Sequence, residues 1–99
     1  MRYNIVKDAD EILKNSTYLV KSPSEYKNKW NTLFANNNPI NLELGMGRGS
    51  FIIEMAKKNP KINYIGLELD KNQTAYAIKT IGSQKINNLK IICASADDI

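Results

Sequence analysis

The residues best suited to chemistry lie in the stretch NLELGMGRGSFI, residues 41–52. It holds three alternating glycines, Gly45, Gly47 and Gly49, and the carboxylate of Glu43 precedes the first of them by two residues. Glycine allows a turn to adopt positive φ and allows a ligand to lie against bare backbone. The G-x-G-x-G spacing differs from the G-x-G-x-x-G of dinucleotide sites. An acid beside the loop repels a diphosphate and attracts a cation, so the stretch predicts a site for a positively charged ligand.

A second acid, Glu68, comes 19 residues after Gly49, at the end of another apolar run. At that spacing a carboxylate typically accepts hydrogen bonds from the hydroxyls of a ribose. A ligand with a cationic end, a ribose and no phosphate satisfies both acids, and S-adenosyl-L-methionine fits that description. Two alternatives stay open at this point: NAD as the ligand, or a tight turn without a ligand and with both acids solvated.

The elements around these residues alternate between strand and helix patterns. Strands are predicted at INLEL (40–44), NYIGLEL (63–69) and NLKIICASA (88–96). Helices are predicted at 50–58, with Phe51, Ile52, Met55 and Ala56 on one face, and at 71–82, closed by Gly82. Single helices between strands indicate a parallel α/β sheet with right-handed crossovers. We therefore expect the β-α-β-α-β half of a Rossmann-like sheet.

A third helix is predicted upstream of the sheet, at SPSEYKNKWNTLF (22–34). Ser22, Pro23 and Glu25 have the spacing of a capped helix start. One apolar face would then carry Tyr26, Trp30, Leu33 and Phe34. We interpret this face as core, and divide the chain into an N-terminal helical extension (1–38) and the N-terminal half of a cofactor-binding domain (39–99).

Composition restricts the function classes. The 99 residues suit one small domain, and the net charge of +4 permits a polyanionic partner without requiring one. Histidine is absent, which excludes histidine-based metal sites and triads within this sequence, and we expect no metal. The one cysteine, Cys93, is interpreted as a small buried hydrophobe in a reducing, cytoplasmic setting. Because apolar runs fall well short of the roughly 20 residues of a membrane span, no membrane partner is expected.

The block WNTLFANNNPINLELGMGRGSFIIEMAKKNPKINYIGLELDKNQTAYAIK resembles the N-terminal part of the bacterial tRNA (guanine-N7-)-methyltransferases. The resemblance implies a class I methyltransferase that transfers a methyl group from S-adenosylmethionine to guanine N7 in the tRNA variable loop. It also implies that Glu43, Glu68 and the three glycines occupy cofactor-binding positions. The family's third such position, usually Asp or Asn, aligns with Ser95, and Asp97 is an alternative two residues later.

The substrate-side motif of that family does not occur in the sequence and is expected beyond Ile99. We therefore expect no catalytic residue in this chain, and predict a fragment that holds the methyl donor and is inactive alone. Two alternatives remain: a methyltransferase with a protein or small-molecule acceptor, and a non-catalytic nucleotide-binding module. Candidate contacts for tRNA phosphates are Arg2, Lys7, Lys14 and Arg48, with ordinary solvated charge as the alternative for each.

Overall fold

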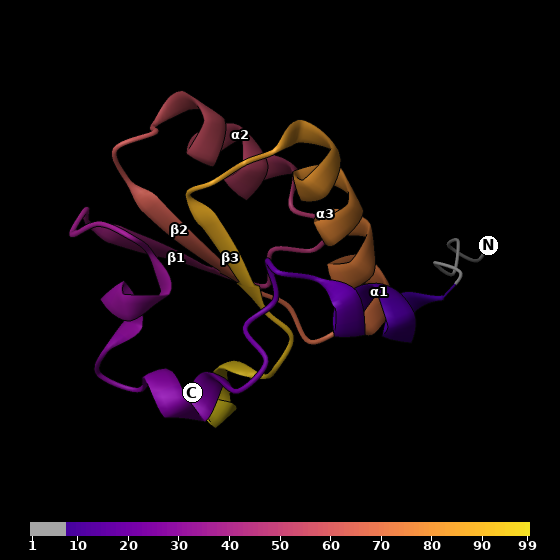
Figure 1. Cartoon of the computed structure of the whole chain (residues 1–99). Coiled ribbons are helices and arrows are strands. Elements are labelled where there is room, and N and C mark those ends of the chain that lie inside the picture. Colours follow the sequence, from indigo (N-terminus) through magenta and orange to yellow (C-terminus); the bar gives the residue numbers. More distant parts are fainter. Residues whose placement is uncertain (1–7) are drawn as a thin grey trace.

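A computed structural model describes residues 8–99 of the chain (Figure 1). Within this range three strands, β1 (Ile40–Leu44), β2 (Asn63–Leu67) and β3 (Leu89–Ile92), form a parallel sheet in the order β1-β2-β3. The crossover helices are α2 (Ser50–Lys58) and α3 (Lys71–Gln84). The predicted β-α-β-α-β arrangement is confirmed.

The sheet lies between two apolar layers. In Figure 1, α2 and α3 cover one face, and residues 20–34, which precede β1, cover part of the other. All five residues of β2 are buried, which explains why its sequence is apolar rather than alternating. β1 is more open, because Leu42 and Leu44 keep 52% and 59% of their surface exposed.

The two edges of the sheet differ. The segment around Leu19 runs beside β3, where the Val20 N–H donates to the Ile91 carbonyl at 2.8 Å and the Ile91 N–H donates to the Tyr18 carbonyl at 2.9 Å. Among residues 8–99, no strand pairs with the outer edge of β1. Within the described residues the β1 edge of the sheet is therefore unpaired.

The N-terminal region is less helical than predicted. It contains α1 (Ala9–Asn15) and two 3-10 turns, η1 (Pro23–Tyr26) and η2 (Trp30–Leu33). The prediction of a single helix over 22–34 is wrong, because Lys27 leaves the helical region (ψ 127°) and Asn28 adopts a left-handed φ of 66°. The apolar residues still meet: the rings of Tyr26 and Trp30 stack with centroids 6.3 Å apart. They pack with the cluster around Phe34.

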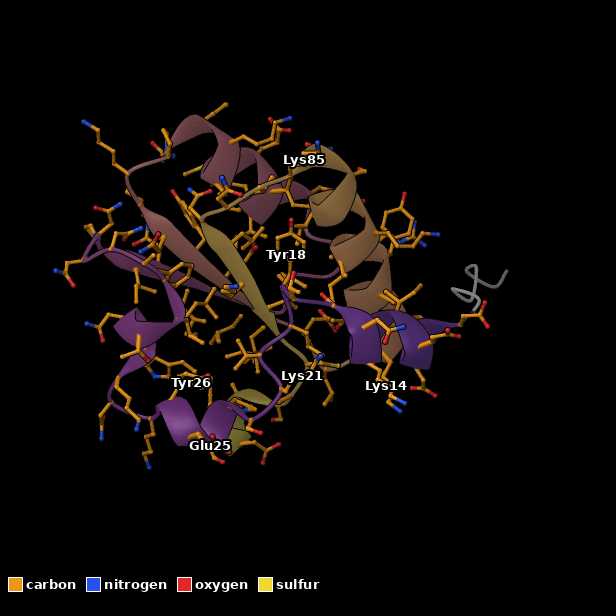
Figure 2. The ribbon with its side chains drawn as sticks, in the orientation of Figure 1. Lys14, Tyr18, Lys21, Glu25, Tyr26 and Lys85 are labelled. Carbon is orange, nitrogen blue, oxygen red and sulfur yellow. The ribbon has the colours of Figure 1, made fainter. Side chains whose placement is uncertain are left out.

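A lysine from the following segment completes the end of α1. The Lys21 ammonium donates to the Lys14 carbonyl at 2.7 Å and to the Ser16 carbonyl at 3.1 Å. Figure 2 shows Lys14 and Lys21 near this end of the helix. Lys14, predicted as a phosphate contact, thus lies in the last turn of α1, and Arg2 and Lys7 fall outside the described residues.

Smaller predictions also need correction. Gly82 lies inside α3, which ends at Gln84 because Lys85 takes the left-handed cap conformation (φ 54°). Phe51 is 66% exposed, and Ile53 is buried in its place. Cys93 is half-buried rather than enclosed.

Candidate functional site

The glycine segment forms the loop between β1 and α2. Gly45, Gly47 and Gly49 have φ of 66°, 62° and 84°, a region that other residues adopt at a cost. The Met46 N–H donates to the Leu67 carbonyl at 3.0 Å and thereby holds the start of the loop against β2. A Cβ built on Gly45 or Gly47 would meet no atom within 4 Å. The loop therefore presents bare backbone to open space, as predicted.

Glu68 lies directly beside this loop. Its Oε1 accepts the Gly47 N–H at 2.8 Å, and its Oε2 accepts the Asp70 N–H at 3.0 Å. Asp70 in turn caps α3 by accepting the N–H groups of Asn72 and Gln73. An ionised carboxylate has about four acceptor positions. Glu68 therefore keeps the capacity to accept two further donors, such as the two hydroxyls of a ribose.

Glu43 lies opposite Gly66 in the β1–β2 register. Its Oε1 is buried and has no hydrogen-bond partner within the described part of the chain, and burial raises the pKa of this carboxyl. The residue lines a recess of about 380 Å³ together with Phe51, Met55 and Tyr64. A buried carboxylate oxygen without a hydrogen-bond partner destabilises the fold. A hydrogen-bond donor or a cation bound at Glu43 would remove that cost.

Ser95 and Asp97 lie beyond the end of β3. The Ser95 hydroxyl accepts the Asp97 N–H at 3.3 Å and caps the short turn η3 (Ala96–Asp98). Asp97 is exposed and lines a separate recess of about 210 Å³ with Lys27 and Trp30. Among the described hydrogen bonds, none joins Ser95 or Asp97 to the loop or to Glu68.

Two residues that the sequence analysis did not single out belong to this edge. Asp70 connects Glu68 to the first turn of α3, and its position just before a predicted helix is the signal that could have found it. Leu69 follows Glu68 and leaves 69% of its surface exposed, which offers an apolar side chain next to the carboxylate in the sequence. An apolar residue directly after a strand-end acid is a weak signal on its own.

Residues 8–99 offer neither a metal-binding cluster nor a membrane-spanning helix. They contain no group of three or more Cys, Asp or Glu side chains placed to hold a metal ion. None of the helices described there has both the length and the apolar character that crossing a bilayer requires.

Comparison with known proteins decides the family. The family model described as "Putative methyltransferase" matches residues 37–99, which include the glycine loop and Glu68. The chain belongs to this methyltransferase family. A similar curated protein is the tRNA (guanine-N(7)-)-methyltransferase of Bacillus subtilis (strain 168), 44% identical over 92 residues. The match covers 92% of this chain and 43% of that protein, so the chain spans less than half the length of this relative.

Solved structures agree on the fold. A SAM-dependent methyltransferase from Aquifex aeolicus superposes with a TM-score of 0.53 at 17% identity, covering 91% of this chain and 48% of that one. The plantazolicin methyltransferase BamL, solved with a triazolic desmethylPZN analog and SAH, gives a TM-score of 0.51 at 23% identity, covering 92% of this chain and 29% of that one. The fold is therefore the Rossmann-like α/β fold of these enzymes.

Proposed function

We propose that this chain provides the methyl-donor half of a tRNA (guanine-N7-)-methyltransferase, with S-adenosylmethionine as cofactor and tRNA as partner. The observation that carries the proposal is the Glu68 carboxylate fastened to the bare Gly47 backbone at the carboxyl ends of β1 and β2. The name of the Bacillus subtilis relative supports the reaction. A tRNA substrate and the single cysteine, typical of a reducing compartment, also support a cytoplasmic location.

The residues present fit the proposed cofactor. The buried Oε1 of Glu43, which has no hydrogen-bond partner among the described residues, suits the cationic methionine end. The open space over Gly45 and Gly47 leaves room for a ligand against the backbone. Glu68 retains two acceptor positions for the ribose. Around the adenine we assign Ser95 or Asp97 as polar contacts, and the exposed Leu69 as an apolar one.

Methyl transfer to guanine N7 requires no catalytic base from the proposed donor half. Guanine N7 carries a free lone pair at neutral pH, so no proton has to leave before it attacks. The bound cofactor would supply an electrophilic methyl group on its sulfonium. The chain's own task is then to bind and orient the donor, so that methyl carbon and acceptor nitrogen are held in line. In this proposal the residues that hold guanine and tRNA belong to the other half of the enzyme.

Isothermal titration of the 99-residue chain with S-adenosylhomocysteine tests the cofactor assignment. We expect measurable binding, and a thermal shift with S-adenosylhomocysteine that NAD does not reproduce. Stronger stabilisation by NAD would replace the proposal with a dinucleotide-binding module. A labelled-methyl assay on unmodified tRNA tests the half-enzyme assignment, since we expect the chain alone to give no transfer. Robust turnover by the 99-residue chain would overturn that assignment.

A further inference from the structure

The glycine loop contacts one face of α3 at three places. A Cβ on Gly49 would lie 3.2 Å from the Cβ of Ala77, so the backbone of the loop is packed closely against the helix. The Arg48 Nε–H donates to the Gln73 side-chain oxygen at 3.3 Å. The Arg48 guanidinium carbon lies 4.6 Å from the centre of the Tyr76 ring. Residues 73, 76 and 77 have i, i+3, i+4 spacing and form a single stripe.

We propose that Arg48 is a positioning residue that latches the glycine loop onto α3 and so keeps the loop in its cofactor-binding shape. The cofactor part of this proposal rests on the proposed function, whereas the latch itself does not. Arg48 is the one loop residue between Gly47 and Gly49, so holding its side chain restricts both neighbouring glycines. Glycine-rich backbone is otherwise free to adopt many conformations, and an attachment to a rigid helix removes that freedom.

The latch and the Glu68 contact hold neighbouring residues of the loop through different groups. Gly47 is held through its backbone N–H by Glu68, and Arg48 is held through its side chain by Gln73 and Tyr76. Asp70 joins the two attachments, because it donates its N–H to Glu68 and accepts the N–H of Gln73. Loop, strand end and helix start therefore form one connected unit. In this arrangement Arg48 serves the loop rather than a tRNA phosphate.

The expected effect follows from the exposure of the pair. Arg48 and Tyr76 are both exposed, and exposed cation–π contacts change an equilibrium by roughly two- to five-fold. Removing the contact between Arg48 and Tyr76 should increase the equilibrium constant for opening of the loop by the same two to five times. Hydrogen exchange at the Gly47 and Gly49 amides, which are bonded to Glu68 and to the Met46 carbonyl, reports that opening directly. The dissociation constant of S-adenosylhomocysteine should rise by up to the same factor.

The test compares Arg48→Gln, Tyr76→Leu and the double variant in the 99-residue chain, by amide exchange and by titration with S-adenosylhomocysteine. We expect faster exchange at Gly47 and Gly49 in each single variant, and no further increase in the double variant. Tyr76→Phe keeps the ring and should behave like the wild type. Asn88→Ala is the control for general stability, because its side chain bonds the carbonyls of Ala56, Asn59 and Ile62 away from the loop. It should lower the melting temperature without raising the dissociation constant.

Independent, additive effects of Arg48→Gln and Tyr76→Leu on amide exchange would overturn the latch. So would a loss of affinity in Arg48→Gln with none in Tyr76→Leu, which would show that Arg48 acts on a ligand directly. If the wild-type chain fails to bind S-adenosylhomocysteine, the proposed function fails for this chain, and the exchange measurements still decide the latch.

Discussion

Replacing Glu68 by Ala should weaken both the fold and the cofactor site. The carboxylate accepts the N–H groups of Gly47 at 2.8 Å and Asp70 at 3.0 Å, and both lose their acceptor in the variant. A hydrogen bond to a charged group contributes about 1.5–3 kcal/mol. Because Glu68 is only half-buried, water can replace part of the lost bonding, and we count one such bond rather than two. For a chain of this length the melting temperature should fall by roughly 6–24 °C.

The same substitution should raise the dissociation constant of S-adenosylhomocysteine by about ten- to 150-fold, if the ribose takes a bond of similar strength. Thermal unfolding by circular dichroism and isothermal titration measure the two effects separately. Glu68→Gln keeps one acceptor oxygen and should lie between wild type and Glu68→Ala. Glu54→Ala is the matched control, because Glu54 pairs with Lys57 at 3.6 Å on the exposed side of α2 and should contribute little.

Two results would refute this reasoning at different points. An unchanged melting temperature in Glu68→Ala would mean that the bonds to Gly47 and Asp70 do not hold the loop. A lower melting temperature with unchanged affinity would mean that the loop is held as described and that the ribose assignment is wrong.

The remaining predictions concern two loop and helix glycines and the half-buried acid Glu43. Gly49→Ala should destabilise the fold by about 1–2 kcal/mol, because φ at this position is 84° and the new methyl group meets Ala77 and Ile53. Gly82→Ala, inside α3, should instead stabilise the fold by about 0.5–1 kcal/mol. Urea unfolding checks both, and equal effects would contradict the argument. Burial raises the pKa of Glu43, so the folded state binds the extra proton and loses stability as pH rises above the ordinary value of 4.5. Glu43→Gln should therefore be more stable than wild type at pH 7 and no more stable below pH 4.5, and a gap that does not change with pH would contradict this origin.

The sheet and its helices were predictable because their signals are local. The sequence pattern places β1 at 40–44 and α2 at 50–58, and the structure has both elements at these bounds. The β2 and β3 segments were predicted too long at their carboxyl ends, by two and four residues. Those last residues, which include Glu68 and Ser95, lie beyond the strands that the structure has, and apolar composition does not signal where a strand ends.

The region 22–34 shows where local signals mislead. Ser22, Pro23 and Glu25 have the spacing of a helix start, yet the Ser22 side chain makes no capping bond and the backbone leaves the helical conformation at Asn28. The apolar residues of this region still join the cluster around Phe34, through two short turns instead of one helix. Burial of these side chains against the sheet stabilises the fold whichever backbone conformation brings them there. Helical spacing alone could not distinguish the two.

The sequence by itself determined the alternation of strand and helix, the bare loop, and the two acids at successive strand ends, because each depends on residue type and short spacing. Only the tertiary structure decided which groups touch. It brought Gly47 to Glu68 across 21 positions of sequence, and it placed Arg48 on Gln73 and Tyr76. It also placed Gly66 under the Met46 sulfur, where an added Cβ would lie 2.5 Å away and the Met46 side chain would have to shift. Such contacts arise from the parallel register of β1 and β2 and from the position of α3 against the sheet, and no short stretch of sequence encodes either.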